Sequence, residues 1–185
     1  MDFNNSCVNK STAGFDNGEL KLFDLRTNAV LWETAVEYGI CSVQFDRKDI
    51  EMNKLVVTTL AGNALVYDMR TFNEKSGYAY SKIKCHDSTV WKAGHLPQDR
   101  DIWMTSGGNG SLELWQYKYP SKRQKHLKNG KIEGVMGESK KVTEATISEQ
   151  PITGIDWSID KKGLGACVGL DQKLSVFIVT KLNLL

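Results

Sequence analysis

The sequence has no apolar run that approaches the roughly 18 consecutive residues of a membrane-spanning helix. Its first ten residues, Met1–Lys10, are polar and contain no apolar stretch of the kind that a secretory signal peptide needs. We therefore expect a cytoplasmic chain that does not contact the membrane.

Closely spaced cysteines are also missing. No Cys-x-x-Cys pair is present, whereas zinc and redox sites usually show such spacing. We predict free and mostly buried thiols, no metal site and no cofactor. The four cysteines are Cys7, Cys41, Cys85 and Cys167.

Few residues suit acid–base catalysis, because the chain has only three histidines and no G-x-S-x-G motif to hold a nucleophile. His95 beside Cys85 or Ser88 is the one conceivable pair of base and nucleophile. We predict that the chain is not an enzyme, and an enzyme built on His95 is the least favoured alternative.

Basic residues are concentrated in one segment. Residues 118–141 contain eight lysines and arginines against two glutamates, although the net charge of the whole chain is only +2. We interpret residues 118–149 as a mobile basic loop inserted between strands. If the loop binds a partner, an acidic protein surface is favoured and nucleic acid is unlikely, because the interior of the loop lacks aromatic residues for base stacking. The candidate contacts are Lys122, Arg123 and Lys125.

One pattern recurs along the chain: a polar turn with Gly, Asn or Asp, followed by an alternating apolar strand that ends in an aromatic residue. The closing aromatic residues are Phe23, Tyr67, Trp115 and Phe177, which lie 44, 48 and 62 residues apart. The first two separations are close to the roughly 40–45 residues of one propeller blade. The basic segment lengthens the third.

The rest of each repeat also favours strands. Short apolar runs such as Lys54–Leu60 and Asp101–Gly107 are bounded by turn residues, as is typical of strands buried on both faces. We predict an all-β fold of about three and a half four-stranded antiparallel blades. The expected blades are residues 13–38, 39–84, 85–150 and 151–185, and residues 1–12 are expected to be irregular or a truncated strand.

The closing Phe-Asp and Tyr-Asp pairs and the glycine-rich turns resemble WD repeats, which implies a β-propeller. In that family a histidine, a hydroxyl residue on the central strand, a turn aspartate and the closing tryptophan form a buried hydrogen-bond network. His86, Thr105 or Ser106, and Trp115 match these positions. The turn aspartate is absent, and Asn109 lies nearby.

Longer segments resemble a narrower family, the WD-repeat proteins associated with assembly of axonemal dynein arms. The matching segments are GFDNGELKLFDLR, SVQFDRKDIEMNKLV, HDSTVW and IVTKLN. This resemblance implies a cytoplasmic scaffold or adaptor that links a co-chaperone complex, with AAA+ ATPases and a prefoldin-like module, to dynein chains. It also implies that the chain is the C-terminal half of a propeller of about seven blades, so that the missing half lies in the full-length chain. A half ring exposes an apolar face and unpaired strand edges, so we expect this chain alone to be marginally stable or prone to aggregate.

Two successive repeats end in the same four-residue pattern, FDLR and YDMR. This pair resembles the double box of WD-repeat substrate receptors for cullin-RING ubiquitin ligases, in which the arginines contact the adaptor. Arg26 and Arg70 would be those arginines. The alternative is that Asp24 and Asp68 pair locally with them, and both interpretations stay open.

Overall fold

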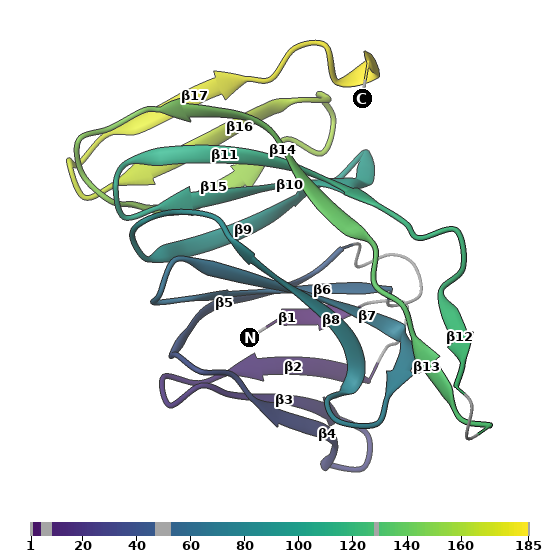
Figure 1. Cartoon of the computed structure of the whole chain (residues 1–185). Coiled ribbons are helices and arrows are strands. Elements are labelled where there is room, and N and C mark those ends of the chain that lie inside the picture. Colours follow the sequence, from purple (N-terminus) through teal and green to yellow (C-terminus); the bar gives the residue numbers. More distant parts are fainter. Residues whose placement is uncertain (1, 5–8, 47–52, 128–129, 185) are drawn as a thin grey trace.

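A computed structural model describes residues 2–4, 9–46, 53–127 and 130–184 (Figure 1). Within these residues the protein is all-β, which confirms the predicted fold class, and a single 3-10 turn, Leu182–Leu184, is the only helical element. Four antiparallel sheets follow one another along the chain, and in each of them consecutive strands are hydrogen-bonded neighbours.

The first two sheets have four strands each. The first sheet contains β1 (Asp2–Asn4), β2 (Lys10–Gly14), β3 (Glu19–Asp24) and β4 (Ala29–Ala35). The second contains β5 (Ile40–Phe45), β6 (Lys54–Thr59), β7 (Asn63–Asn73) and β8 (Gly77–Lys84). Residues 1–12 were expected to be irregular or a truncated strand, but β1 and the start of β2 lie in this range and complete the first sheet.

The third sheet has four strands and the fourth has three. The third contains β9 (Val90–Leu96), β10 (Asp99–Gly107), β11 (Ser111–Lys118) and β14 (Glu138–Thr146). The fourth contains β15 (Ile152–Trp157), β16 (Leu164–Gly169) and β17 (Leu174–Ile178). A separate two-stranded hairpin is formed by β12 (Gln124–His126) and β13 (Ile132–Gly134).

Consecutive sheets pack face to face, and the core consists of the three layers between them. The central strands β6 and β10 are therefore covered on both sides, and every residue of β6 is buried. The first layer includes Leu20, Leu22, Phe45, Leu55 and Tyr67. The second includes Val56, Val66, Trp103 and Trp115, and the third includes Met104, Leu114, Ile155 and Trp157.

The up-and-down order of the strands creates two rims. We call the first the turn rim; it carries the tight turns β2–β3, β6–β7, β10–β11 and β16–β17 and the connections from each sheet to the next, at the left of Figure 1. Three of these turns have a glycine in the left-handed region, for example Gly62 (φ 79°) and Gly110 (φ 77°), and the β16–β17 turn has Gln172 (φ 62°) there. The opposite rim, the insert rim, carries the long connection from β11 to β14.

Residues 118–149 are not a single loop as the sequence predicted. Lys118 ends β11, residues 119–137 carry the hairpin β12–β13, and Glu138–Thr146 form the outermost strand of the third sheet. An outermost strand is largely exposed to solvent, so β14 does not need alternating apolar residues. Its many charged residues are therefore also compatible with a loop, which is what the sequence analysis predicted. We call residues 119–137 the insert.

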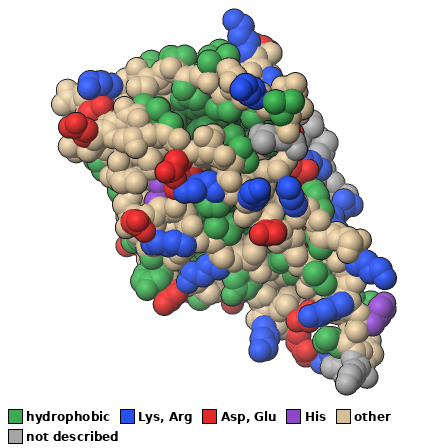
Figure 2. Space-filling model, turned by 45° about the horizontal axis from the view of Figure 1, so that its top comes forward, with side chains coloured by type: hydrophobic (Ala, Val, Ile, Leu, Met, Phe, Trp, Pro, Cys, Tyr) green, Lys and Arg blue, Asp and Glu red, His purple; other side chains and the backbone are tan. Residues whose placement is uncertain are grey.

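The last sheet differs from the others at its outer face. Leu174, Val176 and Ile178 point away from the third sheet and are 69%, 69% and 67% exposed, while Phe177 on the other face packs edge-on against Trp157. Hydrophobic side chains gather at this end of the molecule (Figure 2). No fourth strand pairs with β17 among the described residues, so its edge and one apolar face are open.

We expect this face to drive self-association, because exposed apolar surface and an unpaired strand edge both promote intermolecular contact. The double substitution Leu174→Lys with Val176→Lys should reduce light scattering and shift the chain toward monomer at micromolar concentration. The matched control is Ile132→Lys on the hairpin, where the side chain is 48% exposed and the same change should have little effect. A wild-type chain that is monomeric and melts cooperatively would contradict this expectation.

Candidate functional site

A chain of hydrogen bonds crosses the third sheet at the residues that the WD-repeat resemblance suggested. The Trp115 indole Nε1 donates to Thr105 Oγ1 at 3.1 Å, and Thr105 Oγ1 lies 2.9 Å from Nε2 of His86. His86 Nδ1 lies 3.0 Å from Ser111 Oγ, which donates to Asn109 Oδ1 at 2.8 Å. Five residues from two strands and two connections are thus linked.

The protonation state of His86 fits this chain. Burial lowers the pKa of His86 to about 4, so the ring is neutral at pH 7. A neutral ring with its proton on Nδ1 donates to Ser111 and accepts from Thr105, so that each hydroxyl donates one bond. Thr105, and not Ser106, is the hydroxyl residue of the chain. Ser111 was missed, although its position two residues after Asn109 could have suggested it.

The insert is held by ion pairs with the rest of the chain. Arg123 Nε lies 3.1 Å from Asp68 Oδ2, and Arg123 Nη2 donates to Asn53 Oδ1 at 2.7 Å. Lys125 pairs with Glu133 across the hairpin at 2.8 Å, and Lys131 pairs with Glu74 at 2.5 Å. Most of the basic residues that the sequence suggested for partner binding therefore form ion pairs with carboxylates of this chain.

The three basic residues proposed for partner binding differ in their surroundings. Lys122 is exposed and makes no ion pair among the described residues. Arg123 is only partly exposed, and its guanidinium lies 4.8 Å from the centre of the Tyr119 ring. Of the three residues proposed for an acidic partner, Arg123 is thus an internal anchor, while Lys122 and Lys125 remain on the surface.

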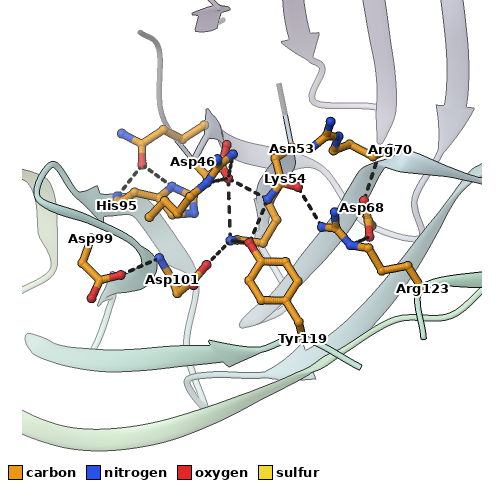
Figure 3. Close-up of polar contacts among 12 residues, drawn as sticks. Asp46, Asn53, Lys54, Asp68, Arg70, His95, Asp99, Asp101, Tyr119 and Arg123 are labelled. Atoms are coloured by element: carbon orange, nitrogen blue, oxygen red, sulfur yellow. Dashed lines mark hydrogen bonds and ion pairs between the residues drawn. The ribbon is translucent and has the colours of Figure 1, made fainter. Parts of the chain in front are cut away.

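A buried ionic cluster lies where the insert leaves the third sheet (Figure 3). Lys54 at the start of β6 is fully buried, and its Nζ lies 2.6 Å from both Asp101 Oδ1 and the Tyr119 hydroxyl. Asp46, just after β5, is 3.6 Å from Lys54 Nζ and 2.6 Å from Arg100 Nη2. The cluster joins the second sheet, the third sheet and the insert.

Opposite charges in this cluster favour the ionised forms of their neighbours. Burial alone would raise the pKa of the Asp46 carboxyl, but the neighbouring cations and the hydrogen bonds from Asn53 and Arg100 hold it below its ordinary value. Burial lowers the pKa of Lys54, and the carboxylates of Asp101 and Asp46 oppose that shift. Sequence analysis missed the cluster because Lys54 opens an apolar strand and Asp101 and Tyr119 lie 47 and 65 residues further along the chain.

Arg26 and Arg70 both lie toward the insert rim. In each case the arginine backbone N–H donates to the aspartate two residues earlier, at 2.9 Å to Asp24 and 3.0 Å to Asp68. The Arg26 side chain is 70% exposed and approaches Asp24 Oδ2 at 3.7 Å. The second carboxylate differs, because Asp68 Oδ2 pairs with Arg123 of the insert.

The pair of base and nucleophile considered for catalysis does not form. His95 is buried and its Nδ1 lies 3.2 Å from Gln44 Oε1, while burial raises the pKa of Cys85, whose Sγ faces the Ile83 carbonyl. The described part of the chain has no group of three or more His, Cys, Asp or Glu side chains placed to hold a metal ion. Among the same residues, no helix has the length and apolar character needed to cross a membrane.

Stacked four-stranded antiparallel sheets, joined by tight turns on one rim and tied by a His–Thr–Trp chain, define a partial β-propeller of WD type. No family model matches the chain. It is 53% identical to dynein axonemal assembly factor 10 of Xenopus laevis and 52% identical to that of Homo sapiens, each over 171 residues. The protein of the same name from Chlamydomonas reinhardtii is 49% identical over 172 residues.

Each of these matches covers 92% of this chain and 48% of the relative. The chain is a homologue of the dynein axonemal assembly factor 10 family over the C-terminal half of those proteins, which confirms the resemblance found in its motifs. It spans about half the length of the curated relatives that it matches.

The hydrogen-bond chain predicts different costs for two neighbouring hydroxyl residues. Thr105→Val keeps the shape of the side chain but leaves Trp115 Nε1 and His86 Nε2 without partners. It should lower the free energy of unfolding by about 1–3 kcal/mol in urea denaturation. Ser106→Ala is the control, because Ser106 Oγ is buried with no hydrogen-bond partner in the described structure, and its loss should cost far less. Equal effects would contradict a role for this chain in stability.

The ionic anchor of the insert gives a second matched pair. Arg123→Ala leaves the buried Asp68 carboxylate unpaired and should cost about 3 kcal/mol in unfolding free energy. Amide hydrogen exchange of the hairpin should also become faster. Lys122→Ala removes the adjacent exposed cation and should change stability by less than about 0.5 kcal/mol. An unchanged exchange rate in the Arg123→Ala variant would show that the insert is held by other contacts.

Proposed function

We propose that this chain is part of a non-enzymatic scaffold that acts in the cytoplasm during assembly of axonemal dyneins. The observation that carries the proposal is the 49–53% identity, over nearly the whole chain, to proteins named dynein axonemal assembly factor 10. The fold supports it, because rigid stacked sheets with two rims of loops are suited to holding protein partners.

The proposed mechanism is that of an adaptor. One surface of the propeller binds a co-chaperone complex with AAA+ ATPases and a prefoldin-like module, and another binds dynein chains that await assembly. The tight turns lie on one rim, and the lysine-rich insert lies on the other. Two unlike surfaces on one rigid body allow two partners to be held together without competing.

The open face of the last sheet supports a role within a longer propeller. Leu174, Val176 and Ile178 form an apolar face of the kind that the other sheets bury against a neighbour. The relatives are about twice as long as the matched segment. We propose that a full-length chain supplies the remaining blades of the propeller and that they cover this face.

The alternative function is a substrate receptor of a cullin-RING ubiquitin ligase that binds its adaptor through Arg26 and Arg70. The exposed Arg26 side chain and the placement of both arginines toward one rim favour it. Against it, Asp24 pairs with Arg26, and Asp68 is used by Arg123.

Affinity purification with quantitative mass spectrometry tests both functions. The tagged chain, its Arg26→Ala/Arg70→Ala variant and a tag-only control are expressed in ciliated cells, together with a full-length relative. We expect dynein chains and chaperone subunits to be enriched equally with the wild type and the variant. Enrichment of a cullin adaptor that the double substitution abolishes, without dynein chains, would overturn the scaffold proposal and support the receptor.

A further inference from the structure

A groove of about 800 Å³ lies on the outer side of the first two sheets. Its walls are the end of β4, the strand β8 and residues 134–136 of the insert. This volume lies within the roughly 300–1,000 Å³ of ligand-binding clefts in proteins. The groove exists because the insert docks against β7 and β8, where a Cβ on Gly134 would lie only 2.6 Å from Thr71 Oγ1.

Aromatic side chains line the groove. Tyr38 and Tyr80 are both 45% exposed, although large apolar side chains in this chain are mostly packed into the core. Tyr80 stacks on the buried Tyr67 with 5.1 Å between ring centres, and Tyr67 in turn meets Trp32 edge-on at 5.4 Å. The Tyr80 ring is therefore held in place before any partner arrives, as is typical of anchor sites in protein interfaces.

Cations outnumber anions along the same walls. Lys75, Lys82 and Lys125 line the groove against the single carboxylate of Glu37. Glu37 pairs with Lys82 at 2.9 Å near the turn rim, and Lys125 pairs with Glu133 at the other end. Lys75, which is exposed, makes no ion pair among the described residues. Among the described residues of the lining, Lys75 is thus the cation that no carboxylate neutralises.

Polar groups that suit a peptide backbone stand between these charges. Thr34, Asn63, Asn73 and Ser76 contribute to the lining. The groove follows β8, which has eight residues and at about 3.3 Å per residue spans about 26 Å. An extended segment of a partner would run beside this strand.

We propose that this groove binds an extended acidic segment of a partner protein, with apolar or aromatic side chains against Tyr38 and Tyr80 and carboxylates at Lys75 and Lys125. The inference rests on the proposed scaffold function and names the chemistry of one of its partners. Charge complementarity selects the acidic partner, since Lys75 has no carboxylate partner among the described residues and Lys82 and Lys125 are each matched by only one, Glu37 and Glu133.

Fluorescence anisotropy with labelled peptides tests the proposal on the whole chain. The probe is an eight-residue peptide of alternating Glu and Phe, and its counterpart carries Lys in place of every Glu. We expect the acidic probe to bind, raised salt to weaken it, and the basic probe to bind at least tenfold more weakly. Equal binding of the two probes, or no binding of the acidic one, would overturn the proposal.

Matched variants locate the site. Lys75→Ala/Lys125→Ala should weaken the acidic probe at least tenfold, and Tyr80→Ala should weaken it by a similar factor. Lys122→Ala/Lys140→Ala removes two exposed lysines that do not line the groove and should leave binding unchanged. If this control loses as much affinity as the groove variant, attraction to the net charge explains the binding and the groove is not the site.

Two further readouts keep the outcome clear. Circular dichroism checks that each variant is folded, and hydrogen exchange of β8 and residues 134–136 should slow when the acidic probe binds. Unchanged exchange there, with binding intact, would place the site elsewhere. Because these measurements use no dynein or chaperone, a failed groove test leaves the assembly role standing, and a failed purification leaves the groove to be judged on its own.

Discussion

The fold depends on one constraint, namely that neighbouring sheets bury the faces they turn toward each other. The central strands show it most clearly, since β6 is buried along its whole length and carries Val56 and Val57 into two different core layers. Burial of apolar area at about 25 cal/mol per Å² makes each layer a large stabilising contribution. The apolar face at β17 is exposed because no neighbouring sheet covers it among the described residues.

Polar interactions add specificity to this apolar stack. The layer between the second and third sheets contains the stacked pair Trp103 and Trp115, and at its edges lie the His86 chain and the Lys54 cluster. A buried lysine is costly unless carboxylates surround it. Asp46 belongs to the same sheet as Lys54, but Asp101 belongs to the third sheet and meets Lys54 only when the two sheets adopt one relative position. The two polar systems therefore fix the register of neighbouring sheets, while the apolar layers supply most of the free energy.

Features with a local signature were predictable from the sequence. The strand pattern, the closing aromatic residues and the partners His86, Thr105 and Trp115 depend on spacing within one repeat, and the structure places those three side chains in one hydrogen-bond chain. The Lys54 cluster and the anchoring of Arg123 on Asp68 depend on contacts between residues 47 to 70 positions apart, for which no short motif exists. The error at residues 118–149 has the same origin, because an exposed outer strand such as β14 has no apolar period to reveal it.

The insert connects these two kinds of interaction to function. Its basic composition suggested a surface that binds partners, yet Arg123 and Lys131 form ion pairs with Asp68 and Glu74 of the same chain. Those internal pairs hold the backbone of residues 134–136 close to β8, and that placement makes the wall of the groove. Part of the insert's positive charge thus forms internal ion pairs that position the wall of the groove. The lysines that line the groove are the ones proposed to recognise a partner.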